Sequence, residues 1–259
     1  MSNNSPPGPL SGHVALITGA GRGIGRAIAE RLAGDGAAVA LVARSDDELQ
    51  EVREAIEAEG GQAIACPLDL VDPGTPAQAV TATVAAFGGL SILVNNAGGA
   101  HKLRTLERLA EEDFRLGTEL NYSSVYRLMR EAGPHLFASA GELRPSVLNI
   151  VSIGAQSALE GMSYYTGAKS AVTGLSRTAA REWGPHGVRV NCLAPGWIET
   201  DLSASLRADA TFVDSTLGRT PLGRFGTPTD VADAAAFLVS DAAAFVTGTT
   251  LFVDGGYLT

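Results

Sequence analysis

The stretch Val14-Ala-Leu-Ile-Thr-Gly-Ala-Gly-Arg-Gly-Ile-Gly25 decides the fold class of this chain. Five residues of β character lead into a run of glycines, and a helical segment begins at Ile24. Glycine lets backbone amides approach a pyrophosphate closely, and the start of a helix offers free N–H groups and a partial positive charge. We therefore expect a nucleotide to bind at this turn. The alternative is a tight strand-to-helix turn with no ligand.

Short apolar runs alternate with helical stretches along the rest of the chain. The expected strands are apolar almost throughout, which is typical of parallel strands covered on both faces; they span Val14–Thr18, Ala38–Val42, Gln62–Leu68, Ile92–Asn95, Val147–Val151, Val188–Leu193 and Thr249–Val253. The expected helices span residues 24–34, 46–59, 76–87, 107–131, 163–184 and 229–240. This alternation predicts an α/β fold with one doubly wound parallel sheet of about seven strands and helices on both faces. Ligands of such sheets bind outside the carboxyl ends of the strands.

Composition excludes several classes of function. The net charge of −9 and the pI near 4.9 argue against nucleic acid as the main partner, because phosphate binding needs a basic face. The two cysteines, Cys66 and Cys192, lie in apolar runs and indicate buried thiols in a reducing compartment. They show no metal-ligand spacing with the four histidines, so no metal site is expected. No apolar run approaches the ~18–20 residues of a membrane span, and we expect a cytoplasmic protein.

The 259 residues are expected to form one large domain, residues 13–259, with no linker that would divide off a second one. Residues 1–12 are polar and proline-rich and predict a disordered tail rather than a signal peptide. Residues 199–221 form the longest stretch without clear strand character. Because this stretch follows a strand end, it is a candidate lid over the substrate.

Two arginines bear on which dinucleotide binds. The loop has the spacing Gly-x-x-x-Gly-x-Gly, and Arg26 stands where the Gly-x-Gly-x-x-Gly fingerprint has its last glycine. The second strand ends in Ala43-Arg44-Ser45, so the acid that would grip a ribose 2′-hydroxyl is missing there. Arg22 and Arg44 converging on one phosphate favour NADP(H) over NAD(H). The alternatives are that Arg44 is only a surface residue and that Asp46 folds back toward the ribose.

Two further strand ends carry candidate cofactor contacts. Asp69-Leu70 follows the third strand, where an adenine could lie, although Asp69 could equally cap the next helix. Asn95-Asn96-Ala97-Gly98 ends the fourth strand. Its small residues would let a ribose approach the backbone, and an Asn side chain can tie neighbouring strands together.

Tyr165 and Lys169 are the candidate proton-transfer pair. At positions i and i+4 they project from one helix face, and an ammonium so close is expected to stabilise the phenolate of Tyr165. Ser152 at the end of the fifth strand and Asn121 in the preceding long helix are candidates to hold the reacting oxygen and a water. Taken singly, the pair could be an ordinary surface pair, Ser152 a polar strand end and Asn121 a helix-surface residue.

In this order the segments resemble the short-chain dehydrogenase/reductase family in its single-domain, Rossmann-fold form, over essentially the whole chain after the tail. The resemblance implies Tyr165 as general acid/base, Lys169 as the group that lowers its pKa and holds the nicotinamide ribose, Ser152 as the group that orients the substrate oxygen, and Asn121 as part of a water relay. It also implies a nicotinamide site at Pro195-Gly196, with the Ile198 backbone and the Thr200 hydroxyl on the carboxamide. The full expected cofactor set is Gly19, Gly21, Arg22, Gly23, Ile24, Gly25, Arg44, Asp69, Leu70, Asn96, Ala97, Gly98, Tyr165, Lys169, Pro195, Gly196, Ile198 and Thr200.

Within that family the pattern is similar to 3-oxoacyl-[acyl-carrier-protein] reductases and to sugar or steroid dehydrogenases. The resemblance implies hydride transfer between the nicotinamide and a small carbonyl or alcohol substrate, and a homotetramer or homodimer packed through residues 246–256. Arg127, Arg130 and Arg181 could contact a carrier protein, but neighbouring glutamates dilute that patch. The alternatives are an NAD(H)-dependent alcohol, sugar or steroid dehydrogenase, an enoyl reductase, and a cofactor-sensing protein without turnover.

Overall fold

One parallel sheet of seven strands, in the order β3-β2-β1-β4-β5-β6-β7, forms the centre of the molecule. The structure is a computed structural model that describes residues 8–100 and 102–259. The strands span Val14–Thr18 (β1), Ala38–Ala43 (β2), Gln62–Pro67 (β3), Ile92–Asn95 (β4), Ser146–Ile150 (β5), Arg189–Pro195 (β6) and Thr250–Val253 (β7). The strand order confirms the doubly wound α/β sheet, and the observed strand bounds lie within two residues of those expected.

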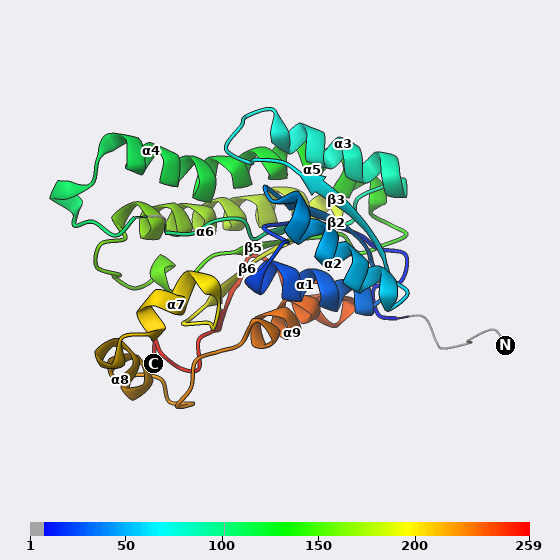
Figure 1. Cartoon of the computed structure of the whole chain (residues 1–259). Helices are drawn as coiled ribbons and strands as arrows, with labels where there is room; N and C mark the ends of the chain where they lie inside the picture. The colour runs from blue at the N-terminus through cyan, green and yellow to red at the C-terminus, as the bar shows by residue number, and fades with distance from the viewer. Residues whose placement is uncertain (1–7, 101) are drawn as a thin grey trace.

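Helices cover both faces of the sheet (Figure 1). One face carries α1 (Gly23–Gly34), α2 (Asp46–Ala58) and α9 (Pro228–Val239), and the other carries α3 (Thr75–Phe87), α5 (Ser124–Ser139) and α6 (Ser163–Trp183). Successive strand residues point to opposite faces. In β1, Ile17 joins the core under α1 and α9, whereas Leu16 joins the core under α3 and α5. Short 3-10 turns lie at Leu106–Arg108, Ile153–Ala155, Gly184–His186 and Asp241–Ala243.

The strand order reverses direction between β1 and β4. From β1 the sheet grows toward β2 and β3 on one side and toward β4, β5, β6 and β7 on the other. The connections after β1 and β4 therefore leave toward opposite faces, and ligands of doubly wound sheets bind at the carboxyl ends of the strands where this reversal occurs. Thr18 and Asn95 end the two strands, so the glycine loop and the Asn-Asn-Ala-Gly segment face each other.

The helix expected at 107–131 is wrong in its bounds. The chain instead forms α4 (Glu111–Thr118), a π-helical turn at Glu119–Ser123, and α5, which runs on to Ser139. Pro134 lies inside α5, where it removes one helix hydrogen bond. The helix nevertheless continues, because Leu128, Ala132 and Leu136 keep one face buried beyond that point.

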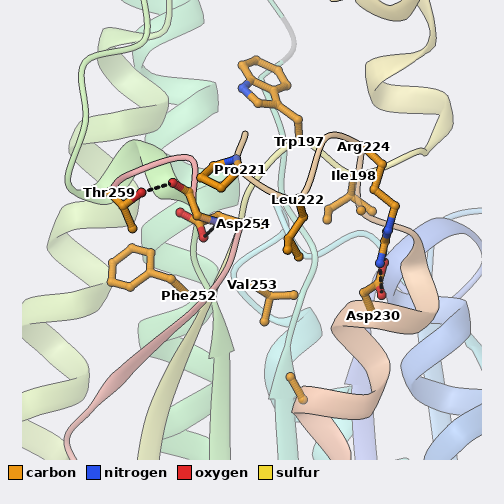
Figure 2. A pocket seen from close by; sticks show the side chains of 14 residues that line it. Trp197, Ile198, Pro221, Leu222, Arg224, Asp230, Phe252, Val253, Asp254 and Thr259 are labelled. Carbon is orange, nitrogen blue, oxygen red and sulfur yellow. Dashed lines mark hydrogen bonds and ion pairs between the residues drawn. The ribbon is translucent and has the colours of Figure 1, made fainter. Parts of the chain in front are cut away.

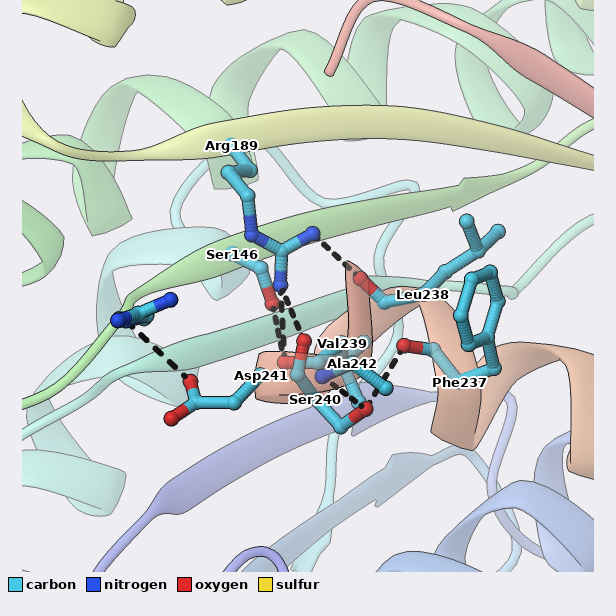
Figure 3. A network of polar contacts seen from close by, with 9 residues as sticks. Ser146, Arg189, Phe237, Leu238, Val239, Ser240, Asp241 and Ala242 are labelled. Atoms are coloured by element: carbon cyan, nitrogen blue, oxygen red, sulfur yellow. Dashed lines mark hydrogen bonds and ion pairs between the residues drawn. The ribbon is translucent and has the colours of Figure 1, made fainter. Parts of the chain in front are cut away.

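A buried arginine closes the carboxyl end of α9 (Figure 3). The Arg189 guanidinium, only 7% exposed, donates hydrogen bonds to the carbonyls of Leu238 at 2.6 Å, Val239 at 3.1 Å and Ser240 at 3.1 Å. The last carbonyls of a helix have no partner within the helix. Arg189, on β6, supplies those partners and fixes α9 to the sheet.

The N-terminal segment differs in part from the expected tail. Residues 1–7 lie outside the described residues. Residues 8–12 are packed against the domain: Leu10 is fully buried, and its N–H donates to the Asp35 carbonyl at 2.9 Å. An apolar side chain at this position closes the core beside α1, so the packed region begins before residue 13.

The stretch at 199–221 contains two short helices, α7 (Asp201–Arg207) and α8 (Ala210–Gly218), and no strand. They stand away from the sheet at one end of the molecule, near the C-terminus (Figure 1). Their role as a substrate lid stays a prediction. Across the part of the chain that the structure describes, none of the helices has the length and apolar character that crossing a membrane requires.

Candidate active site

The glycine loop forms a cradle that side chains would fill. Gly19 and Gly23 have φ of +65° and +56°, in the left-handed region that favours glycine. A Cβ on Gly25 would lie 2.1 Å from the Gly19 carbonyl oxygen and 2.5 Å from Nδ2 of Asn96. Helix α1 starts here, and its N-cap residue, Arg22, makes no side-chain cap. The N-terminus of α1, which no side chain caps, and the close-packed glycines beside it fit the pyrophosphate of a dinucleotide.

Thr18 and Asn96 hold this cradle in place. The Thr18 hydroxyl accepts hydrogen bonds from the N–H groups of Asn96 at 2.9 Å and Ala97 at 3.0 Å. The Asn96 amide donates in return to the carbonyls of Thr18 at 2.8 Å and Gly19 at 3.2 Å. Thr18 is absent from the set of site residues expected from the sequence. Its position as the last strand residue before the first glycine is the signal that could have identified it.

The paired Asn residues tie strands together, as expected. The Asn95 amide donates to Oδ1 of Asn149 on β5 at 2.7 Å, and Asn149 donates to the Ser176 hydroxyl on α6 at 2.8 Å. The Cys192 thiol on β6 extends this chain, 3.1 Å from the same hydroxyl. All four side chains are buried. They fix α6, which carries Tyr165, against the carboxyl ends of the central strands.

The two arginines expected at the 2′-position of the ribose have different surroundings. Arg22 lies 3.7 Å from a carboxylate oxygen of Glu48 and 3.8 Å from one of Asp201. Arg44 is exposed and forms no ion pair with the residues that the structure describes. Asp46 is not folded back over this corner, because its carboxylate accepts a hydrogen bond from Gln50 on its own helix at 3.0 Å.

The segment after the third strand, Asp69-Leu70, excludes one of the two roles considered for Asp69, that of a helix cap. Helix α3 begins at Thr75 with Gly74 as its N-cap, so Asp69 does not cap it. The exposed Asp69 carboxylate instead accepts the N–H of Val71 at 3.1 Å and shapes the turn after β3. Leu70 is 4% exposed, and its side chain belongs to the core. A contact of either residue with an adenine stays a prediction.

Tyr165, Lys169 and Ser152 come together at the carboxyl end of β5. Ser152 and Tyr165 share a side-chain hydrogen bond, and the Ser152 hydroxyl also accepts the N–H of Gly154 at 3.0 Å. Nζ of Lys169 lies 5.7 Å from the centre of the Tyr165 ring and donates to the Ile150 carbonyl at 2.9 Å. Lys169 is only 3% exposed. A hydroxyl, a phenol and an ammonium therefore share one small region.

Asn121 and Gly98 join this cluster to the cofactor side. A Cβ on Gly98 would lie 2.6 Å from Oδ1 of Asn121 and 3.1 Å from Nζ of Lys169. Asn121 is fully buried in the π-helical turn, where its amide donates to the carbonyls of Gly117 at 2.9 Å and Gly99 at 3.1 Å. Its side chain also accepts the Gly99 N–H at 3.0 Å. Both N–H groups of the amide are used in these bonds, so a water in a relay could be held only by the Asn121 side-chain oxygen or by the main chain.

The pKa of Tyr165 moves opposite to the expected direction. Burial raises the pKa of this phenol, and only the hydrogen bond with Ser152 opposes that rise. Burial likewise lowers the pKa of Lys169 to about 8. Both shifts have one cause, because removal from water disfavours the phenolate and the ammonium alike. Tyr165 is therefore protonated at neutral pH, the form that donates a proton to a carbonyl oxygen.

The neighbouring Tyr164 takes a structural position. It is 2% exposed, and its hydroxyl accepts the N–H of Lys102 at 3.1 Å and donates to the Lys102 carbonyl at 3.2 Å. Adjacent helix residues point about 100° apart. The helix thus directs Tyr164 toward the segment after β4 and Tyr165 toward Ser152.

The segment after β6 brings Thr200, at the start of α7, next to the glycine loop. Gly196 continues the strand edge, donating its N–H to the Val253 carbonyl at 2.9 Å, and Ile198 is buried and forms a bridge with Gly226. Thr200 is the N-cap of α7, and its methyl group lies 3.4 Å from where a Cβ on Gly23 would stand. Thr200 therefore lies close to the glycine loop, and a contact of Pro195, Gly196, Ile198 and Thr200 with a nicotinamide stays a prediction.

A cavity of about 670 Å³ lies behind this segment (Figure 2). Its walls include Trp197, Leu222 and Phe252, and the Arg224–Asp230 ion pair closes one side with contacts of 2.7 and 2.9 Å. None of the catalytic candidates lines it. The cavity is therefore separate from the Ser152–Tyr165–Lys169 cluster.

The fold and the site together define a nicotinamide-dependent oxidoreductase, and comparison with known proteins agrees. Residues 19–258 match the family model described as enoyl-(acyl carrier protein) reductase. The chain is 37% identical over 247 residues to gluconate 5-dehydrogenase of Gluconobacter oxydans, covering 95% of each chain. It is 38% identical over 247 residues to the 3-oxoacyl-[acyl-carrier-protein] reductase of Escherichia coli, covering 95% of this chain and 98% of that one.

Solved structures extend the likeness to three dimensions. A 7α-hydroxysteroid dehydrogenase with NADH and 7-oxoglycochenodeoxycholic acid has a TM-score of 0.91 and 36% identity, covering 95% of this chain and 94% of that one. A protein from Beutenbergia cavernae assigned as an NAD(P)-dependent gluconate 5-dehydrogenase, with bound NADP, has a TM-score of 0.90 and 38% identity, covering 96% and 98%. The chain belongs to the short-chain dehydrogenase/reductase family and is an enzyme of NAD(P)-dependent hydride transfer.

Proposed function

We propose that the protein is an NADP(H)-dependent oxidoreductase acting on a carbonyl or secondary alcohol, with Tyr165 as the general acid/base. The observation that carries this proposal is the shared site of Ser152, Tyr165 and Lys169 beside Gly98. The glycine cradle and the uncapped start of α1 would hold the dinucleotide, and Arg22 and Arg44 would hold its 2′-phosphate.

The residues divide the work around the substrate oxygen. The Ser152 hydroxyl and the Tyr165 phenol would both hydrogen-bond this oxygen, and Tyr165 would give its proton in reduction or take one in oxidation. Lys169 places a positive charge 5.7 Å from the phenol ring, which stabilises the phenolate that proton donation leaves behind. The bound nicotinamide supplies or accepts the hydride at C4. Because these groups are held by the ends of β5 and by α6, they need little rearrangement during the reaction.

Replacing Tyr165 by Phe tests this assignment directly. Tyr165→Phe keeps the ring and removes the proton donor, so turnover should fall by a factor of about 10²–10⁴. The Kd for NADPH, measured by fluorescence, should stay within about twofold of that of the unchanged protein. Tyr164→Phe is the matched control, because this hydroxyl bonds the Lys102 main chain, and it should keep most of the turnover. Substantial residual turnover in Tyr165→Phe would exclude the proposed role.

The description of the matching family model suggests reduction of a carbon–carbon double bond as a second candidate. The four-residue spacing from Tyr165 to Lys169 favours a carbonyl or alcohol instead, since enoyl reductases usually space these residues further apart. NADPH oxidation against matched β-keto and enoyl thioesters would separate the two. NADPH binding with no turnover on carbonyls, alcohols or enoyl compounds would favour a cofactor-sensing protein.

Two of the three basic residues considered for binding an acyl carrier protein are already partnered, whereas Arg181 is exposed and has no ion pair among the described residues. Arg127 forms an ion pair with Glu119, and Arg130 lies 2.5 Å from a carboxylate oxygen of Glu131. Partnered cations offer little attraction to an acidic partner. We therefore favour a free small-molecule substrate.

The protein is proposed to work as a homotetramer or homodimer in the cytoplasm. β7 is an edge strand, and Phe237, Phe245 and Leu251 on or near it are 44%, 103% and 36% exposed. An apolar sheet edge of this kind is usually covered by a partner. Cys66 and Cys192 are buried free thiols, which supports a reducing compartment.

A further inference from the structure

The Arg22 side chain, at the start of α1, lies between two carboxylates from different elements. Its Nη1 is 3.7 Å from Oε1 of Glu48, in the first turn of α2, and 3.8 Å from Oδ2 of Asp201, the first residue of α7. The Arg22 side chain is 65% exposed, so a ligand from solvent can reach it. The positive charge of Arg22 is thus partly neutralised by these two carboxylates before a phosphate binds.

Glu48 is held over the glycine loop. A Cβ on Gly21 would lie 2.8 Å from Oε2 of Glu48 and 3.0 Å from its Cβ, so the side chain packs across the loop. The Glu48 N–H donates to the Ser45 hydroxyl at 3.3 Å, which fixes the start of α2. The Glu48 side chain is 39% exposed, against 78% for Asp201. Of the two carboxylates, Glu48 is therefore the better shielded from solvent.

We propose that Glu48, assisted by Asp201, is a specificity-determining residue that limits the preference for a 2′-phosphate. This inference rests on the proposed function, in which Arg22 and Arg44 receive that phosphate. A 2′-phosphate must compete with both carboxylates for Arg22 and is repelled by each of them. A 2′-hydroxyl carries no charge and avoids that penalty. Arg44 has no such carboxylate partner among the described residues and favours NADP(H). The preference for NADP(H) over NAD(H) is therefore smaller than two unpaired arginines would give.

Two adenosine fragments isolate this effect from the rest of the cofactor. Adenosine 2′,5′-bisphosphate and adenosine 5′-monophosphate differ only by the 2′-phosphate, and calorimetry gives the Kd of each. An exposed ion pair contributes about 0.2–1 kcal/mol, so Glu48→Gln should tighten the bisphosphate about 1.5- to 5-fold. The monophosphate should be unchanged. Asp201→Asn should act in the same direction with a smaller change, and both gains should shrink at high salt.

Asp47→Asn is the matched control for Glu48→Gln. Asp47 is exposed in the same helical turn as Glu48 and has no ion pair with Arg22 among the described residues. Its replacement removes the same charge but should leave the ratio of the two Kd values unchanged. If Asp47→Asn matches Glu48→Gln, or if Glu48→Gln tightens both fragments equally, a general charge effect replaces the proposed specific one.

Arg44→Asp separates failure of this inference from failure of the proposed function. It should weaken the bisphosphate and spare the monophosphate. If it leaves both unchanged, the 2′-phosphate site itself is wrong. If it weakens the bisphosphate while neither Glu48→Gln nor Asp201→Asn alters the Kd ratio, the NADP(H) site stands and the role of the carboxylates is refuted. Thermal unfolding followed by circular dichroism verifies that each variant is folded.

Discussion

At the scale of single residues, burial acts on both ionisable groups of the catalytic cluster. Tyr165 stays protonated because its phenolate would lose hydration, and Lys169 holds its proton less firmly for the same reason. Of these two groups, Lys169 is the one whose charge changes nearer to neutral pH, because burial lowers its pKa to about 8. The pH range for reduction should therefore be limited by the lysine rather than by the phenol.

We predict that kcat/KM for carbonyl reduction is level below pH 8 and falls above it. Lys169 is charged below its pKa of about 8 and neutral above it, and the neutral amine no longer stabilises the Tyr165 phenolate. A pH profile measured with saturating NADPH checks this. Lys169→Arg keeps the charge at all these pH values, so the fall should move to higher pH even if the rate is lower. A fall at the same pH in both proteins would assign it to another group.

Most residues of the candidate site could be proposed from the sequence, with Thr18 as an exception, but the surroundings of these residues could not. Ser152, Tyr165 and Lys169 were readable because each sits at a strand end or at helical spacing. The upward shift of the Tyr165 pKa was not, because the extent of burial depends on how α6 packs onto β5. Glu48 was equally hidden, since its contact with Arg22 joins two helices through their tertiary packing.

At the scale of elements, α9 depends on a side chain from another element. Arg189 lies on β6, 49 to 51 residues before the carbonyls of α9 and its C-cap residue that it bonds. Thr227 and Asp230 secure the opposite end, where the Thr227 hydroxyl accepts the Asp230 N–H at 3.2 Å and the Asp230 carboxylate accepts the Thr227 N–H at 2.6 Å. Both ends of α9 are therefore capped by side chains.

Arg189→Met is expected to lower the free energy of unfolding by about 2–4 kcal/mol, because it leaves several buried carbonyls without partners. Chemical denaturation monitored by circular dichroism measures the change. Arg144→Met is the control: Arg144 is 58% exposed and lies 3.7 Å from Asp241, so its loss should cost at most about 1 kcal/mol. Equal losses in the two variants would show that the helix-end bonds add little.

Elements were predictable where one pattern dominated. The strands are apolar almost throughout, so their bounds came close. The region of α4 and α5 was misjudged because Pro134 and a π-helical turn interrupt a helix that tertiary burial sustains. Leu10 lies in a proline-rich segment, and its burial follows from tertiary packing against the core and from its main-chain bond to Asp35.

At the scale of the whole molecule, the sheet ends in an exposed apolar edge. Phe237 on α9 and Leu251 on β7 are large apolar side chains that stay partly in solvent. The parallel, doubly wound sheet could be predicted from the alternation of strands and helices, but the order of its strands comes from the structure. Covering of this edge would require the second chain that we propose.

We expect Phe237→Glu with Leu251→Glu to reduce the assembly to a smaller species, because buried charges oppose association. Light scattering after size-exclusion chromatography measures the mass. Leu106→Glu serves as control, since this side chain is 75% exposed and lies in the connection after β4. An unchanged mass in the double variant would exclude this edge as the interface, and a monomeric starting protein would exclude the proposed homo-oligomer.

The two buried thiols can report the order in which parts of the protein unfold. Cys66 on the edge strand β3 and Cys192 on the interior strand β6 are both buried, and burial raises the pKa of each. Only a thiolate alkylates readily, so each must wait until its strand is exposed. In pulsed iodoacetamide labelling read by mass spectrometry, Cys66 should be modified first and Cys192 only on global unfolding. A dinucleotide that holds β1 and β4 together should slow the second step more than the first.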